Sequence, residues 1–436
     1  MKKIVIFASA LALCVSAFAQ GPKEGPAKPF ESHFKFYGFV RNYYAFDTRE
    51  SSAGTEDLYF YMPKDQNIVD GEDMNAVPSF RYAALTSRVG VDVFGYEVAG
   101  YKVGAKIEAD FYCGVSGVTG TAQLRLRQAY ATLAKDGRAW KLGQAWHPMA
   151  ADLPDIFSLE SGAPFGPFSR TPQITLDYRL MDDLSVTASA IWQMQYTSTG
   201  PSLTKGSDGL YNYSTAAASA NYIKYGVIPE LYLGLNYKWK TNLLRVGADL
   251  LSIKPRNYDY DLTTGKAVGK VSDRLTTINF FQYGQFKVGD WTLKEKITYA
   301  NDGSHFNMVG GYGVSQINSD GSWDYSASRN ISGWFTAQYK SKTSKWSPAL
   351  LLGYIKAFGT KDEIVGDFWC KNSANSVAQM FRIQPEIVYN LGKVAFGLEY
   401  MATGVQYGKA NSHKLAVDNL HWVVNHRLQA MIKYTF

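Results

Sequence analysis

The last nine residues of the chain are Leu428-Gln429-Ala430-Met431-Ile432-Lys433-Tyr434-Thr435-Phe436, and they alternate with a period of two. One set of positions is apolar or aromatic: Phe436, Tyr434, Ile432, Ala430 and Leu428. The other set is mostly polar or cationic: Thr435, Lys433, Met431 and Gln429. Because successive side chains of a strand point to opposite faces, the stretch predicts a strand with one apolar and one polar face.

A second stretch, Tyr101–Tyr112, shows the same alternation over a greater length. The apolar set is Tyr101, Val103, Ala105, Ile107, Ala109 and Phe111, and the other set is Lys102, Gly104, Lys106, Glu108, Asp110 and Tyr112. A strand of a soluble sandwich usually has about five or six residues. A strand that crosses a bilayer at a tilt needs about 9–11 residues. The length therefore favours a transmembrane strand.

The same pattern recurs along the chain and predicts about sixteen strands, an even number within the range of transmembrane barrels. We expect them at 33–47, 80–94, 101–112, 123–133, 139–146, 173–180, 184–196, 231–239, 244–253, 275–287, 291–299, 331–340, 347–356, 377–389, 394–401 and 428–436. Short connections such as 240–242 and 289–290 alternate with long ones, namely 48–79, 197–221, 255–274, 301–330, 358–376 and 403–419. Short periplasmic turns and long extracellular loops are typical of such barrels.

The predicted fold is therefore all-β: one transmembrane antiparallel β-barrel with a water-filled lumen. The barrel must close, because unpaired backbone groups in lipid are unfavourable. We accordingly expect the strand that ends at Phe436 to pair with the strand around Phe36–Tyr44.

The start of the chain has the pattern of a secretory signal peptide. Lys2 and Lys3 precede an apolar run, and Ala17-Phe18-Ala19 is a small-x-small cleavage site. A membrane helix is disfavoured because the run is too short to span about 30 Å of hydrocarbon. Lipid attachment at Cys14 is disfavoured by Leu13 before it. We assign 1–19 to the signal peptide, 20–32 to a periplasmic lead-in and 33–436 to the barrel.

Composition narrows the possible functions. The net charge is +7 and falls to +5 (7 − 2) without Lys2 and Lys3, which gives no argument for nucleic acid as a partner. Aromatic residues make up 15% of the chain, yet the mean hydropathy is −0.21. A helical membrane protein is excluded, because the mature chain has no run of about 18 apolar residues. Cys113 and Cys370 remain after cleavage, and the sequence leaves open whether they pair.

Four motifs, in this order and spacing, resemble the DcaP-like trimeric porins of the Gram-negative outer membrane. They are Phe36-Tyr37-Gly38-Phe39-Val40-Arg41, Ser87-Arg88-Val89-Gly90, Leu124-Arg125-Leu126-Arg127-Gln128-Ala129-Tyr130 and Leu142-Gly143-Gln144-Ala145-Trp146. The resemblance covers about the first 180 residues and the last strand. It implies a homotrimer in outer-membrane lipid that passes small hydrophilic, often anionic, solutes. The lead-in is too short and too rich in proline for the helical extension that such porins can carry.

Six basic residues fall on the polar faces of four neighbouring strands near the N-terminus: Arg41, Arg88, Lys102, Lys106, Arg125 and Arg127. In lipid each would cost about 2–4 kcal/mol near the midplane, so we expect them to face the lumen or a rim. They predict a cationic wall that attracts anions. The alternative is a wall neutralised by Asp92, Glu108 and Asp110 on the same strands.

The segment 147–171 follows the fifth strand and is rich in Pro and Gly, which suits a stiff loop without regular structure. In the porins that the chain resembles, the loop at this place folds into the pore and narrows it. The alternative is an extracellular flap. If the segment folds inward, Asp152, Asp155 and Glu160 can oppose the basic wall, with Arg170 at the end of the segment.

Several other features bear on the function. Glu295 falls in an outward-facing set, which places it at a rim or in a subunit interface, or means that the register is wrong there. The six histidines have no helical metal spacing, so we expect no metal site. Nucleophile-elbow, phosphate-loop and zinc-protease motifs are absent from the sequence, so we expect no enzyme and no cofactor. The sequence favours a porin, and the alternative is a closed barrel that acts as an adhesin or an envelope-structural protein.

Overall fold

The structure is a computed structural model that describes residues 33–53, 60–84, 86–112 and 123–436. The signal peptide and the lead-in therefore lie outside the described residues, and so does Cys113, whose pairing with Cys370 stays open. None of the helices in the described ranges has the length and apolarity that crossing a membrane requires.

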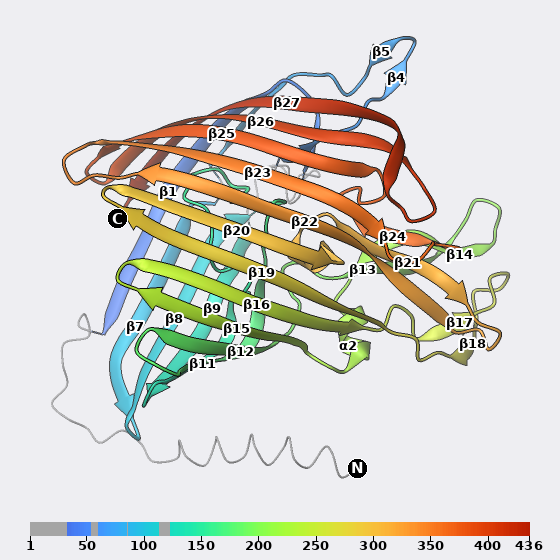
Figure 1. Cartoon of the computed structure of the whole chain (residues 1–436), viewed down its shortest axis with the longest axis horizontal. Coiled ribbons are helices and arrows are strands. Elements are labelled where there is room, and N and C mark those ends of the chain that lie inside the picture. Colours follow the sequence, from blue (N-terminus) through green and yellow to red (C-terminus); the bar gives the residue numbers. More distant parts are fainter. Residues whose placement is uncertain (1–32, 54–59, 85, 113–122) are drawn as a thin grey trace.

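Within these ranges sixteen strands form one closed antiparallel barrel (Figure 1). They are β1 (Phe34–Asp47), β7 (Arg88–Val98), β8 (Tyr101–Tyr112), β9 (Gln123–Lys135), β10 (Arg138–Trp146), β11 (Arg170–Arg179), β12 (Leu184–Ile191), β15 (Glu230–Trp239), β16 (Asn242–Ile253), β19 (Leu275–Val288), β20 (Trp291–Asn301), β22 (Trp323–Tyr339), β23 (Trp346–Thr360), β25 (Val377–Leu391), β26 (Val394–Ala410) and β27 (Ala416–Thr435). A short strand, β6 (Ser79–Ala83), pairs with the C-terminal part of β1, and β7 pairs with its N-terminal part. The predicted fold is confirmed.

The barrel closes between its first and last strands. β1 pairs with β27 from Phe39 opposite Thr435 to Asp47 opposite Arg427. This is the predicted pairing, and it satisfies the backbone groups that an open edge would leave exposed to lipid.

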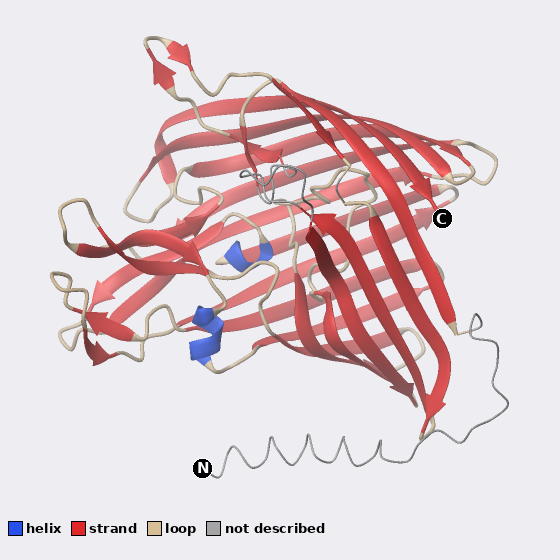
Figure 2. Cartoon of the chain, turned by 180° about the vertical axis from the view of Figure 1, so that it is seen from behind, coloured by secondary structure: helices blue, strands red, loops and turns tan. Residues whose placement is uncertain are grey.

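The connections differ at the two ends of the barrel. Tight turns join the strands at one end, as at Asp136-Gly137, where both residues have the positive φ (49° and 77°) that two-residue hairpins favour. The other end carries longer segments with small hairpins and two short helices (Figures 1 and 2). These elements are β2 (Ser51–Ala53), β3 (Phe60–Pro63), β4 (Ile68–Val69), β5 (Glu72–Asp73), β13 (Thr199–Lys205), β14 (Tyr211–Ala218), α2 (Asn221–Gly226), β17 (Tyr258–Tyr260), β18 (Ala267–Lys270), η2 (Gly303–Phe306), β21 (Gly310–Ile317) and β24 (Phe368–Lys371).

One expected loop is wrong. We predicted a long connection at 403–419, but β26 continues to Ala410 and β27 begins at Ala416. The two strands keep pairing beyond the predicted boundary, with Val405 opposite Val423. Packing from another part of the chain supports this extension, because the Tyr407 hydroxyl donates a hydrogen bond to the Pro63 carbonyl at 2.8 Å.

Side chains face as the alternation predicts. On β8, Ile107 and Phe111 are exposed on the outer surface, whereas Glu108 and Asp110 are buried inside. Glu295 lies on the outer face of β20, where it accepts a hydrogen bond from the Gln282 side chain at 3.0 Å. The predicted register at Glu295 is therefore correct, and a neighbouring amide partners the carboxylate.

Candidate pore constriction

The segment between β10 and β11, residues 147–169, lies inside the barrel and contacts strands on several sides of the wall. The Tyr43 hydroxyl on β1 donates to the Phe157 carbonyl at 2.6 Å. The Phe157 amide donates to Glu386 on β25 at 2.9 Å. The Lys296 ammonium on β20 donates to the carbonyls of Met149 and Asp152 at 2.8 and 2.7 Å. We call residues 147–169 the inward segment.

The three acidic residues of the inward segment each contact a basic residue of the wall. Asp152 pairs with Arg245 on β16 at 2.8 Å, and Asp155 pairs with Lys294 on β20 at 2.6 Å. Glu160 pairs with Arg427 on β27 at 2.6 Å. We expect these carboxylates to oppose the N-terminal basic wall, and Asp155 does share the lining of one cavity with Arg41. Their ion pairs, however, are with strands β16, β20 and β27, because carboxylates removed from water need a counter-charge in contact.

The predicted basic residues on the first four strands do gather on one side of the lumen, and several contact acids there. Arg125 and Arg127 contact Asp110 at 2.8 and 2.6 Å, and Arg127 also contacts Glu108 at 2.8 Å. Lys106 contacts Asp92 at 2.6 Å. Glu108 also lies 3.6 Å from Arg88. Asp92, Glu108 and Asp110 are thus all engaged by basic residues, and they partly neutralise the wall.

The remaining predicted residues take different positions. Arg41 donates to the Thr86 hydroxyl at 3.0 Å and lies over the rings of Phe39 and Tyr43. Lys102 is exposed beside the short turn between β7 and β8. Arg170 begins β11 and is buried with its guanidinium 4.7 Å from the centre of the Trp146 ring.

A cavity of about 180 Å³ separates this basic side from the inward segment. Arg41, Arg88 and Arg127 line it on the wall side, and Ile156 and Phe157 are among the residues that line it on the segment side. None of its described lining residues is a carboxylate. Two further cavities, of about 340 and 270 Å³, have three cations each among their lining residues, against two acids and one acid respectively.

Other strands of the wall carry basic residues that anchor the inward segment and that the sequence analysis missed. The Arg382 guanidinium on β25 donates to the Ala163 carbonyl at 3.0 Å and lies 5.1 Å from the centre of the Phe165 ring. Lys296 and Arg427 are also fully buried. These residues alternate with lipid-facing positions in their strands, and this alternation alone predicts that they face the lumen.

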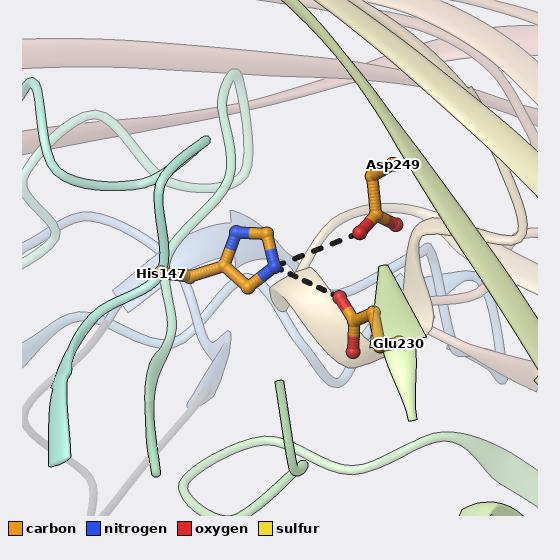
Figure 3. A group of neighbouring side chains, drawn as sticks. All are labelled: His147, Glu230 and Asp249. Carbon is orange, nitrogen blue, oxygen red and sulfur yellow. Dashed lines mark hydrogen bonds and ion pairs between the residues drawn. The ribbon is translucent and has the colours of Figure 1, made fainter. Parts of the chain in front are cut away.

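The inward segment begins at a buried polar cluster (Figure 3). His147 Nε2 lies 2.8 Å from Glu230 Oε1 and 3.7 Å from Asp249 Oδ1. His305 of η2 faces the same two carboxylates at 3.4 and 3.7 Å. Burial lowers the pKa of His305, but Glu230 and Asp249 outweigh this effect and raise the pKa to about 10. The two carboxylates thus favour a positive charge at this place, and a metal ion held by His305 must displace the proton of the ring. Histidine spacing could not predict the cluster, because the fold brings together residues that are far apart in sequence.

The chain resembles known outer-membrane proteins. Residues 9–160 match the profile of the DcaP outer membrane protein family. The structure is similar to the outer membrane channel DcaP of Acinetobacter baumannii, with a TM-score of 0.62 and 20% identity over 92% of this chain and 97% of that chain. It is also similar to an anion-selective porin from Comamonas acidovorans, with a TM-score of 0.53 and 12% identity over 92% of this chain and 99% of that chain. None of the curated proteins matches the chain.

Proposed function

We propose that the chain, which matches the DcaP outer membrane protein family over residues 9–160 and has the fold of an outer-membrane β-barrel, is a passive diffusion channel for small hydrophilic solutes, prefers anions and works as a homotrimer. A barrel of sixteen strands is wide enough to hold a water-filled lumen. The inward segment crosses this lumen and narrows it, so solutes pass between the segment and the wall.

We infer the anion preference from the positive charge of the side chains that line the passage. Three arginines line the cavity of about 180 Å³, and its described lining residues include no acid. Low-dielectric walls focus the field of such charges and raise the local concentration of the opposite ion. The two larger cavities have the same sign of imbalance. An anion therefore meets a favourable potential along the lumen. The anion-selective porin from Comamonas acidovorans has a similar barrel, which agrees with this proposal.

Single-channel recording in a planar bilayer with a salt gradient tests the channel and its anion preference. We expect open-channel conductance and a reversal potential of the sign that anion selectivity gives. The double variant Arg41→Gln with Arg88→Gln removes two charges from the lining of the narrow cavity. Its reversal potential is expected to shift toward that of a cation-selective channel.

Lys102→Gln is the matched control, because it removes a positive charge beside the periplasmic turn and leaves the lining of the narrow cavity unchanged. It should shift the reversal potential less than the double arginine variant does. If the double variant conducts but its reversal potential does not shift, the channel stands and the anion preference attributed to these arginines is overturned. A barrel that inserts without conducting would overturn the channel and favour an adhesin or envelope-structural role.

A further inference from the structure

Four ionisable side chains from distant parts of the chain meet inside the barrel. His147 begins the inward segment, Glu230 begins β15, Asp249 lies on β16 and His305 lies in η2. Their exposed fractions are 1%, 0%, 0% and 2%. Figure 3 shows the His147 ring directed at the two carboxylates. We call these four residues the root cluster.

The root cluster contains polar atoms that the protein leaves unsatisfied. Glu230 Oε2, Asp249 Oδ1 and both ring nitrogens of His305 have no hydrogen-bond partner among the described residues. Glu230 accepts a hydrogen bond from His147 and Asp249 accepts one from Asn279 at 3.3 Å, but burying two carboxylates side by side is still costly. Two carboxylates at one buried place are therefore best stabilised by a cation that both of them contact.

The separations in the root cluster suit a metal ion. His305 Nε2 lies 3.4 Å from Glu230 Oε1 and 3.7 Å from Asp249 Oδ2, which is long for a hydrogen bond. Ligand atoms at about 2.0–2.2 Å from a tetrahedral zinc ion lie about 3.3–3.6 Å from one another. One oxygen each of Glu230 and Asp249 also lie within 4.8 Å of each other and of His147 Nε2. We propose that Glu230, Asp249 and His305 form a binding site for a divalent transition-metal ion such as Zn²⁺.

His147 has a different role in this site. Its Nδ1 accepts a hydrogen bond from the Met149 amide at 3.1 Å, so the ring proton is on Nε2. That nitrogen donates to Glu230 Oε1 at 2.8 Å. His147 is therefore a positioning residue that orients the Glu230 carboxylate, as outer-shell partners of metal ligands do. A water molecule would complete the coordination.

The chemistry of the ligands selects among ions. Imidazole together with carboxylate suits Zn²⁺ and its transition-metal neighbours, whereas Mg²⁺ and Ca²⁺ prefer oxygen ligands only. The cavity of about 270 Å³ is lined by Trp146 and Pro148, the sequence neighbours of His147, and by Tyr232, so it lies next to the root cluster.

Metal analysis of the detergent-purified full-length protein tests the proposal. After treatment with a chelator, the protein is incubated with ZnCl₂, desalted and analysed for bound zinc by atomic emission. We expect one Zn²⁺ per chain for the unmodified protein, and loss of this zinc in His305→Ala and in Asp249→Asn. The control is His421→Ala, which removes a half-buried imidazole that contacts Asp65 at 2.6 Å and should leave the zinc content unchanged.

Affinity measurements separate the positioning residue from the ligands. His147→Ala should bind Zn²⁺ about 10–100-fold more weakly, which is the usual effect of losing an outer-shell partner. His147→Gln should restore most of the affinity, because its amide can still donate to Glu230. If the ligand variants fail to fold, the visible absorption of Co²⁺ added to the unmodified protein gives an independent measure of coordination. Unmodified protein that takes up neither Zn²⁺ nor Co²⁺, or His305→Ala that retains its zinc, would overturn the site.

Discussion

Arg427 joins three parts of the molecule through one side chain. Its guanidinium contacts both oxygens of Asp47 on β1 at 3.0 and 3.1 Å and Glu160 of the inward segment at 2.6 Å. All three residues are buried. The two contacts to Asp47 have the bidentate geometry that favours arginine over lysine. Arg427 thus ties the inward segment to the seam at which the barrel closes.

Replacing this guanidinium should be strongly destabilising. Arg427→Met leaves two carboxylates buried without their counter-charge, and we expect the free energy of unfolding to fall by about 3–5 kcal/mol. Urea-induced unfolding of the reconstituted barrel measures the change. The control is Arg179→Met at an exposed position beside a short turn, where we expect a change within about 0.5 kcal/mol. Equal stability of the two variants would show that Arg427 does not anchor the inward segment.

At the scale of elements, the alternation of apolar and polar residues predicted the strands and their facing. It did not predict irregular pairing. The register of β8 with β9 shifts between Glu108 and Ala109, and β26 extends past the predicted boundary because it packs on Pro63. The alternation also could not predict which residues contact each other, such as Glu160 and Arg427, because these contacts depend on how the inward segment crosses the lumen. A period of two fixes the face of a residue, whereas its partner is set by the tertiary fold.

Cysteine labelling checks the facing of β8. In a background with Cys113→Ser and Cys370→Ser, Lys106→Cys should react with a small, membrane-impermeant thiol reagent, and Ala105→Cys should not. The Lys106 ammonium lies on the lumen side, 2.6 Å from Asp92, and neighbouring side chains of a strand point to opposite faces. The reverse pattern of labelling would mean that the register of β8 is wrong by one residue.

At the scale of the whole molecule, the barrel and the inward segment have separate roles. The ring of strands sets the width of the lumen, and the contacts of the segment with β1, β20, β25 and β27 fill part of it. The contacts from β20 and β27 are made by Lys296 and Arg427, basic side chains that would otherwise face water. Removing the segment should therefore leave a hydrated and strongly cationic lumen inside an intact ring.

Deleting 153–167 and bridging the gap with a short Gly/Ser linker tests this division. We expect a higher single-channel conductance, because the segment occupies the lumen beside Arg41, Arg88 and Arg127. Anion selectivity should persist, since the deletion also removes Asp155 and Glu160 and leaves Lys294 and Arg427 without these counter-charges. Retarded migration of the unheated protein on a denaturing gel, compared with the heated sample, controls for an intact barrel. An intact barrel of unchanged conductance would show that ions pass elsewhere and that the inward segment is not the constriction.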